Sequence, residues 1–319
     1  IEVVSRPYQI DGQHVIIGAS IGVAISPRDG SDPDLLLKNA DMALYHTKSN
    51  GRGSWRLFDP SMDAEIQAKR ALEMDLRRAL AEGQFELYYQ PLINLRTRQV
   101  TTCEALIRWN HPERGLIPPA KFIPAAEDIG IIKEMGDWVI RTATKECPTW
   151  PDSVRVAVNP SSVQFKHSRL TTVVAEALSE SGLSPKRLEV EITESVLLRD
   201  TPGVRTILSE LVAQGVRIAL DDFGTGYSGL SYLHTFPLNK VKIDRSFVAQ
   251  LNSGDRSLTL LKGVARLSSS LGLSVAVEGV ETQEQLEIIA AEDTVDEVQG
   301  YLFSMPLPVA QIRKFIAVH

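Results

Sequence analysis

The feature that most constrains the fold is an apolar run from Val216 to Leu220 that ends in two adjacent carboxylates, Asp221 and Asp222. Two glycines follow within the next four residues. We expect this run to be a buried parallel strand whose carboxyl end presents both aspartates. The glycines let the backbone turn sharply and approach a ligand closely. Taken alone, the stretch is equally compatible with one aspartate that caps the next helix and one that faces solvent.

The same arrangement recurs along the chain from residue 85 onwards. Short apolar runs end in polar or charged residues, and stretches of helical periodicity stand between most of them. The expected strands are 85–91, 100–109, 154–159, 188–194, 216–222, 241–244, 273–278 and 298–301. The expected helices are 124–128, 133–145, 170–181, 203–214, 255–271 and 283–291. About eight strands in about 235 residues, each followed by a helix, predict an α/β fold, a (β/α)8 TIM-type barrel.

The first 57 residues differ from this pattern and predict a small partial α/β domain. A strand-like run covers 14–25, a helix with an apolar face covers 32–49, and a short strand covers 54–58. So few elements cannot build a catalytic site, so we expect a structural remnant or a docking surface. Residues 58–83 then predict a connector that contains a charged helix over 61–82. The same helix could also be the first helix of the following domain, and the two interpretations are compatible.

Composition excludes several other classes of function. The formal net charge of −6 argues against a nucleic acid polymer as a partner, because such binding depends on Lys and Arg contacts to phosphates. No apolar run approaches the roughly 20 residues that span a bilayer, so we expect no membrane contact within this chain. Cys103 and Cys147 have no metal-like spacing, which predicts buried thiols in a reducing, cytoplasmic compartment. The chain opens at Ile1, mid-pattern, so we expect a longer protein, and an upstream membrane or sensor region stays open.

In a barrel of this kind the carboxyl ends of the strands face one rim, where ligands bind. The polar residues at those ends are Glu104, Asn159, Glu191, Asp221, Asp222, Lys242, Glu278 and Gln299. Each one alone could cap a helix. So many strand ends with charged or metal-ligating side chains favour a shared site instead.

The charges at this rim predict a cation site. Five carboxylates against Lys242 and Arg108 leave a formal charge of −3. Carboxylates this close must raise one another's pKa or bind cations, and oxygen ligands suit Mg²⁺ or Mn²⁺. Two divalent ions would bring the sum to about +1, which suits an anionic phosphodiester, and paired ions clamp the attacking and leaving oxygens of a phosphoryl displacement. Asp221 is the natural bridging ligand.

The same residues resemble the EAL-domain family, in order, from about residue 84 to the C-terminus. The matching motifs are Gln90-Pro91, Glu104-Ala105-Leu106 with Arg108, Asn159, Glu191-Ile-Thr-Glu194, Asp221-Asp222-Phe-Gly-Thr-Gly-Tyr227, Lys242-Ile-Asp244, Glu278-Gly-Val-Glu281 and Gln299-Gly-Tyr-Leu-Phe303. The resemblance implies hydrolysis of cyclic di-GMP to linear pGpG with Mg²⁺ or Mn²⁺, on a barrel whose first strand is antiparallel, in a homodimer formed through the barrel. The alternative is a catalytically idle receptor for cyclic di-GMP.

The resemblance also implies roles for single residues. Glu104, Asn159, Glu191 and Asp221 would hold the first metal, and Asp221 with Asp222 the second.

The remaining roles concern water, substrate and loop. Lys242 would position or help deprotonate the attacking water, through a lowered pKa if it acts as a base, and Glu278 would orient that water. Arg108 would clamp a substrate phosphate, Gln90 would face a guanine, and Gln299 would lie near the metals. Glu194 would brace the loop after Asp222, where Ser228-Gly229 replaces the family's usual pair of serines.

The N-terminal part resembles the C-terminal part of a GGDEF (diguanylate cyclase) domain. The resemblance lies in Ala19–Ala24, Asn39–Tyr45 and Lys48–Arg52, and in that family the positions of Lys48 and Arg52 contact nucleotide phosphates. The GG[DE]EF signature does not occur in this sequence, so we expect no synthesis of the cyclic dinucleotide. The predicted domains are therefore 1–57, a partial GGDEF-like domain, 58–83, a connector helix, and 84–319, an EAL barrel.

Overall fold

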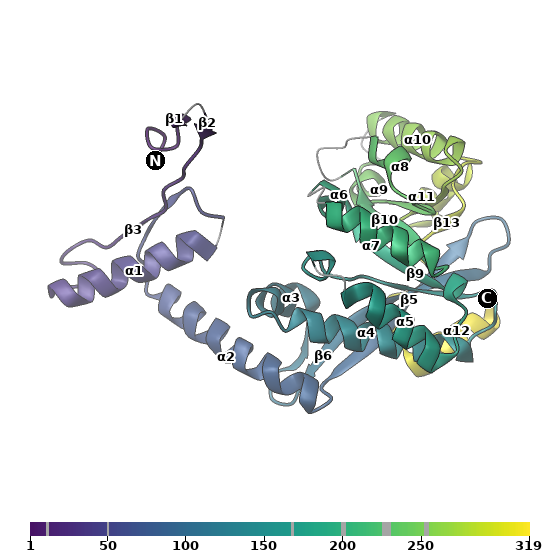
Figure 1. Ribbon diagram of the computed structural model, residues 1–319, viewed down its shortest axis with the longest axis horizontal. Helices are drawn as coiled ribbons and strands as arrows, with labels where there is room; N and C mark the ends of the chain where they lie inside the picture. The colour runs from purple at the N-terminus through teal and green to yellow at the C-terminus, as the bar shows by residue number, and fades with distance from the viewer. Residues whose placement is uncertain (11–12, 50, 167–168, 199–201, 225–230, 252–254) are drawn as a thin grey trace. The chain divides into compact units, whose positions relative to one another are not determined.

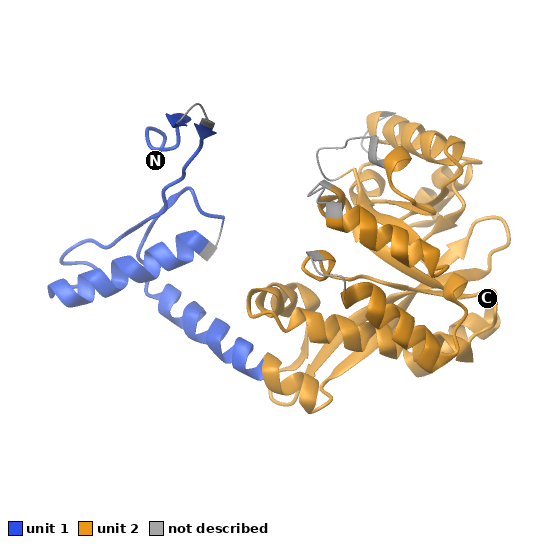
Figure 2. Cartoon of the chain, in the orientation of Figure 1, with its two compact units in different colours: residues 1–75 blue, residues 76–319 orange. Residues whose placement is uncertain are grey.

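The apolar runs from residue 85 onwards form a closed ring of eight strands, in the order β5-β13-β12-β11-β10-β9-β8-β6 and back to β5. Figure 1 draws the chain with its helices and strands. The structure is a computed structural model that describes residues 1–319 except 11–12, 50, 167–168, 199–201, 225–230 and 252–254. The chain divides into two compact units, residues 1–75 and residues 76–319 (Figure 2). The division falls inside helix α2, Ser61–Ala81.

The ring confirms the predicted barrel with one reversed strand. Its strands are β5 (Phe85–Asn94), β6 (Val100–His111), β8 (Arg155–Val158), β9 (Leu188–Thr193), β10 (Arg217–Phe223), β11 (Lys240–Ile243), β12 (Ser274–Val277) and β13 (Glu297–Val298). Strand β5 pairs antiparallel with both β6 and β13, and the other neighbours in the ring are parallel. Two short strands, β7 (Gly115–Ile117) and β14 (Leu307–Pro308), pair with β6 and β5 outside the ring.

Helices pack against the ring through an apolar layer. They are α3 (Pro119–Asp128), α4 (Ile132–Glu146), α5 (Arg169–Ser181), α6 (Glu194–Leu198), α7 (Pro202–Ala213), α8 (Ser231–Thr235), α9 (Arg245–Ala249), α10 (Asp255–Ser270), α11 (Gln283–Ala290) and α12 (Val309–Val318). The predicted helix at 124–128 begins five residues earlier than expected. A proline is favourable in the first turn of a helix, and it is Pro119, not Pro124, that occupies this position.

The interior of the ring is polar, because strand residues alternate between two faces. On β9, Val190 and Ile192 belong to the apolar core shared with the helices, whereas Glu189 and Glu191 are fully buried away from it. Glu189 contacts Lys240 of β11, a strand that is not its neighbour. Such a contact crosses the inside of the ring. Where many barrels of this class fill the interior with branched apolar side chains, this one carries charges.

The first unit is small. Strands β1 (Tyr8–Ile10) and β2 (Gln13–Val15) are antiparallel, and β3 (Ile21–Val23) pairs parallel with β4 (Trp55–Leu57) beside helix α1 (Pro33–Ser49). The prediction of a single strand over 14–25 was wrong. Residues 16–20 belong to no strand, and Ile16, 72% exposed, has no buried face to join.

Helix α1 packs directly on strand β3, because Gly22 has no side chain. A Cβ there would lie 2.1 Å from the carbonyl oxygen of Ala40.

Within the described residues of the whole chain, no helix combines the length and the apolar character that crossing a membrane requires.

Candidate active site

One lysine lies in the middle of four carboxylates at the mouth of the barrel. The Nζ atom of Lys242, on β11, is 2.6 Å from Glu278, 2.9 Å from Glu191, 3.1 Å from Asp221 and 3.4 Å from Glu104. These carboxylates come from β6, β9, β10 and the residue after β12, and Lys242 is fully buried. We call these five residues the upper cluster. The structure thus brings together five of the residues predicted from strand ends.

The upper cluster perturbs the protonation of its members. Burial lowers the pKa of Lys242, but the surrounding carboxylates outweigh burial and hold this pKa well above its ordinary value. Burial raises the pKa of Glu191 well above its usual range, and it raises the pKa of Glu278 to about 8, in both cases against the attraction of Lys242. One cation therefore does not compensate the carboxylates around it. A lowered pKa of Lys242, one of the sequence-based alternatives, does not arise among these groups.

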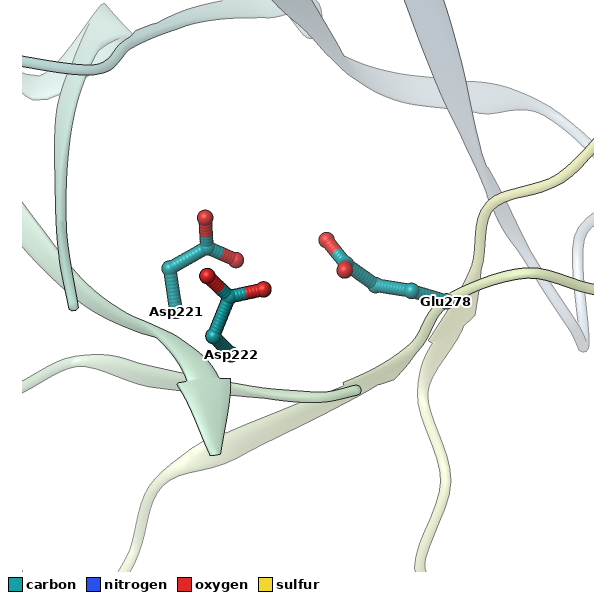
Figure 3. A group of neighbouring side chains, drawn as sticks. All are labelled: Asp221, Asp222 and Glu278. Carbon is teal, nitrogen blue, oxygen red and sulfur yellow. The ribbon is translucent and has the colours of Figure 1, made fainter. Parts of the chain in front are cut away.

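Asp222 joins the site through an irregularity in its strand. Consecutive strand residues normally point to opposite faces, but the pairing of β10 with β11 shifts register between Leu220 and Phe223. Asp222 has a left-handed backbone with φ 53°, and such a bulge re-aims a side chain. Asp221, Asp222 and Glu278 consequently face one another, each with a carboxylate oxygen within 4.8 Å of the others (Figure 3).

Amide side chains surround Glu104 at the other side of the mouth. Asn159 Nδ2 and Gln299 Nε2 each donate a hydrogen bond of 2.7 Å to Glu104. Gln299 also donates to Gln90, which in turn donates to the carbonyl of Ser304. Burial raises the pKa of Glu104, but Lys242 and these amides outweigh burial and lower it overall.

Two further predicted residues, Arg108 and Glu194, belong neither to the upper cluster nor to the amides around Glu104. Arg108 is partly buried, lies 5.3 Å over the ring of Tyr88, and donates to the carbonyl of Ile107. Glu194 accepts a hydrogen bond from the backbone N–H of Gly224, at the start of the loop after the aspartate pair. Ser228-Gly229, further along this loop, lies outside the described residues.

A cavity of about 260 Å³ opens above the upper cluster. The predicted residues that line it are Gln90, Glu104, Asp221, Asp222, Glu278 and Gln299. Arg245, Glu281 and Tyr301 also line it, and sequence reasoning gave them no role. For two of them the sequence held a pattern that could have revealed them: a charged residue stands three positions after a predicted site residue, Arg245 after Lys242 and Glu281 after Glu278.

A second charged layer lies beneath the first and was also missed. Lys240 Nζ is 2.7 Å from Glu189 and 2.8 Å from Glu297, and it donates to Thr102. We call these four residues the lower cluster; Arg155 and Arg217 contact its carboxylates from the side. Each member stands two residues before an inward-facing member of the mouth, in the pairs 102/104, 189/191, 240/242 and 297/299. This alternation is the signal that could have revealed it.

The donor set fits Mg²⁺ or Mn²⁺. Glu191 Oε1 and Gln299 Oε1 are buried, and no described residue hydrogen-bonds to either atom. The groups around them are carboxylate and amide oxygens, the ligands that these hard cations prefer. The four carboxylates of the upper cluster exceed its one ammonium, that of Lys242, in charge, so added cations would be stabilised.

Comparison with known proteins assigns this site to a family. The family model described as "EAL domain" matches residues 73–306, and that described as "Diguanylate cyclase, GGDEF domain" matches residues 1–54. The chain therefore belongs to the EAL-domain family, with a short GGDEF-matching stretch before the barrel.

Similar proteins agree with this assignment. An uncharacterised protein, y4lL, of Sinorhizobium fredii is 48% identical over 98% of this chain and 38% of its own length. The bifunctional diguanylate cyclase/cyclic di-GMP phosphodiesterase MucR of Pseudomonas aeruginosa is 40% identical over 98% of this chain and 46% of its own length. The solved MucR phosphodiesterase in its c-di-GMP complex has a TM-score of 0.73 at 39% identity, covering 76% of this chain and 99% of that chain. The chain spans less than half the length of these two curated relatives.

Proposed function

We propose that this chain hydrolyses cyclic di-GMP to linear pGpG, with two Mg²⁺ or Mn²⁺ ions per site. The observation that supports this most is the convergence of Asp221, Asp222 and Glu278 above a lysine surrounded by carboxylates, at the mouth of an EAL-family barrel. The c-di-GMP complex of the similar MucR phosphodiesterase supports the choice of substrate. We keep the domain boundaries 1–57, 58–83 and 84–319 as part of the proposal.

The metal ligands follow from the donor set. Glu104, Asn159, Glu191 and Asp221 would hold the first ion, with Asn159 offering its oxygen because its nitrogen donates to Glu104. Asp221 and Asp222 would hold the second. When bound, the ions would supply a clamp for the attacking and leaving oxygens of the displaced phosphate.

The chain's own side chains would orient the reactants. Lys242, which the surrounding carboxylates hold as an ammonium by raising its pKa, would position the attacking water. Glu278, 2.6 Å from its Nζ, would fix the direction of the ammonium and of that water. Arg108 would clamp a substrate phosphate, and Gln90 and Gln299 would contact the substrate from the cavity wall. Glu194 would hold the loop after Asp222 through Gly224.

The proposal extends to the oligomeric state of the protein and to its location in the cell. We expect a homodimer through the barrel and a cytoplasmic location. The second is supported by Cys103 and Cys147, which are both buried and unpaired with each other, as thiols of reducing compartments are.

The proposal is tested by incubating the protein with cyclic di-GMP and Mg²⁺ or Mn²⁺, and then with excess EDTA. We expect pGpG in the presence of either ion and none after chelation, measured by liquid chromatography. Binding of cyclic di-GMP without any product would select the alternative, a catalytically idle receptor.

Variants of the upper cluster test the assigned roles. Because both side chains act at the reacting centre, we expect Glu104→Ala and Lys242→Ala each to lower turnover by about 100-fold or more. Glu104→Ala should also weaken Mn²⁺ binding, measured by calorimetry. Lys262→Ala is the matched control, since Lys262 lies on α10, pairs with Glu292 and does not line the cavity. Substantial hydrolysis by both upper-cluster variants would contradict these roles.

A further inference from the structure

Arg245 contributes a cation to the wall of the cavity. It lines the cavity together with five carboxylates, those of Glu104, Asp221, Asp222, Glu278 and Glu281. Within the described part of the chain, no side chain forms an ion pair or hydrogen bond with its guanidinium. Lys242, by contrast, is buried beneath the cavity and held by its own carboxylates.

The backbone holds Arg245 at this position from two sides. It is the first residue of α9, and the side chain of Asp244 caps this helix by accepting a 2.9 Å hydrogen bond from the backbone N–H of Ser246. On the other side lies Gly279, with φ 71°, where a Cβ would come within 2.3 Å of the Cβ of Arg245. The loop after Glu278 therefore needs a glycine to let Arg245 stand at the rim.

The position of Arg245 in the ring complements that of Arg108. Arg108 lies on β6, and Arg245 is the second residue after the end of β11. In the closed order of eight strands, β6 and β11 are four places apart in either direction, so the two arginines belong to opposite sides of the mouth. A cyclic dinucleotide carries its two phosphodiesters on opposite sides of its ring, and only one of them is cleaved.

We propose that Arg245 binds the phosphodiester of cyclic di-GMP that is not cleaved, an inference that rests on the proposed function. The acidic centre with its cations would take the scissile phosphate, and Arg245, on the side of the mouth opposite Arg108, would take the second phosphate. A guanidinium forms paired, charge-assisted hydrogen bonds with phosphate oxygens. Arg245 is thus a substrate-binding residue and not a group that moves protons.

The experiment compares Arg245→Ala, Arg245→Lys and Arg256→Ala by steady-state hydrolysis of cyclic di-GMP. Arg256 is the control, because it is an exposed arginine on the neighbouring helix α10 and does not line the cavity. An interaction made equally in the ground and transition states changes KM and not kcat. We expect Arg245→Ala to raise KM about 10- to 100-fold with kcat within about threefold. Arg245→Lys should recover KM only in part, because an ammonium keeps the charge and loses the paired hydrogen bonds, and Arg256→Ala should change neither constant.

A small substrate identifies which phosphate is bound. Bis(4-nitrophenyl) phosphate has a single phosphodiester, so the loss caused by Arg245→Ala should be at least about tenfold smaller on it than on cyclic di-GMP. Equal losses on both substrates would place Arg245 at the reacting centre and overturn the proposal. An unchanged KM in Arg245→Ala, or a KM in Arg245→Lys as high as in Arg245→Ala, would overturn it as well.

The failure of this inference can be told from the failure of the proposed function. If the wild type yields no pGpG, the proposed hydrolysis fails, and calorimetric binding of cyclic di-GMP then decides on Arg245. An affinity loss of about 10- to 100-fold in Arg245→Ala would still support the phosphate contact. An unchanged affinity, or no binding by the wild type, would overturn it.

Discussion

Asp222 adopts a backbone conformation that most side chains avoid. Its φ of 53° places it in the left-handed region, which Asn and Asp enter more readily than other residues with a side chain and which is most strained for β-branched ones. This conformation lets two consecutive carboxylates face one cavity. Asp suits position 222 for two reasons: it supplies a second carboxylate to the cavity, and it tolerates the left-handed backbone conformation.

Two substitutions separate these requirements. Because Asn also tolerates the left-handed region, we expect Asp222→Asn to keep the free energy of unfolding within about 0.5 kcal/mol while weakening Mn²⁺ binding. Asp222→Val should weaken Mn²⁺ binding and should also lower the free energy of unfolding by about 1–3 kcal/mol, because a β-branched residue is strained in this backbone conformation. Urea unfolding and Mn²⁺ titration measure the two quantities. Equal unfolding free energies in the two variants would refute the backbone argument.

At this scale the sequence predicted part of the site. Glu104, Glu191 and Lys242 could be placed together because parallel strands present their carboxyl ends at one rim, and the structure confirms that they meet. Lys240 was missed because a residue two positions earlier looks like any other member of a strand until pairing fixes which face is inside. Arg245 was missed because its five-residue helix is too short to show periodicity.

Helix α9 contacts the loops on both of its sides. Phe247 lies against Gly224, after the aspartate pair, and Arg245 lies against Gly279, after Glu278. Strand β11, which leads into α9, stands between β10 and β12 in the ring. The helix therefore sets how far the aspartate pair stands from Glu278.

Glycine substitutions test the packing of α9. A Cβ at Gly224, φ 98°, would lie 2.4 Å from the ring of Phe247, so we expect Gly224→Ala to lose about 1–3 kcal/mol of stability and most of the turnover. The matched control is Gly263→Ala in the interior of α10, where nothing lies within 4 Å of the new Cβ. Gly263→Ala should raise the free energy of unfolding by about 0.5–1 kcal/mol, because Ala favours a helix more than Gly does. The prediction fails if thermal and urea unfolding show the same sign for both variants.

Elements far from the site show what periodicity cannot decide. The reversed strand β5 followed from the resemblance to the EAL family and not from the pattern of β5 itself. The run 14–25 was expected to be one strand, yet Ile16 and Ile17 are exposed and unpaired by any described strand. Apolar residues form a strand only where a neighbour offers hydrogen bonds and a buried face, and a local pattern does not contain that neighbour.

For the whole molecule, the lower cluster is a buried ionic layer that closes the barrel beneath the site. Burial lowers the pKa of Lys240, but Glu189 and Glu297 outweigh burial and raise it overall. Burial raises the pKa of Glu297, but Lys240 outweighs burial and lowers it overall. The stabilisation from Glu297 is lost as pH falls through its folded pKa, and that from Lys240 as pH rises through its folded pKa.

Removal of Lys240 should therefore destabilise the protein most strongly between about pH 5 and pH 10. We expect Lys240→Met to lower the free energy of unfolding by about 3–5 kcal/mol at pH 7, because it removes the buried cation that both carboxylates share and leaves each only its lateral arginine. Lys262→Met removes a partly exposed ion pair with Glu292 and should cost at most about 1 kcal/mol. Urea unfolding from about pH 3 to about pH 12, beyond both ends of this range, gives both values. A difference between wild type and Lys240→Met that does not shrink at either extreme would contradict the assignment.

The ammonium of Lys242 has a consequence for how such a protein matures. Small zinc domains stay unfolded until their ion arrives, because nothing else neutralises their ligands. Here the polypeptide supplies a counter-ion of its own, held by carboxylates from four different parts of the ring. On the proposed function, the barrel would close around that internal charge first and load divalent ions afterwards, so this chain without ions would be folded and inactive.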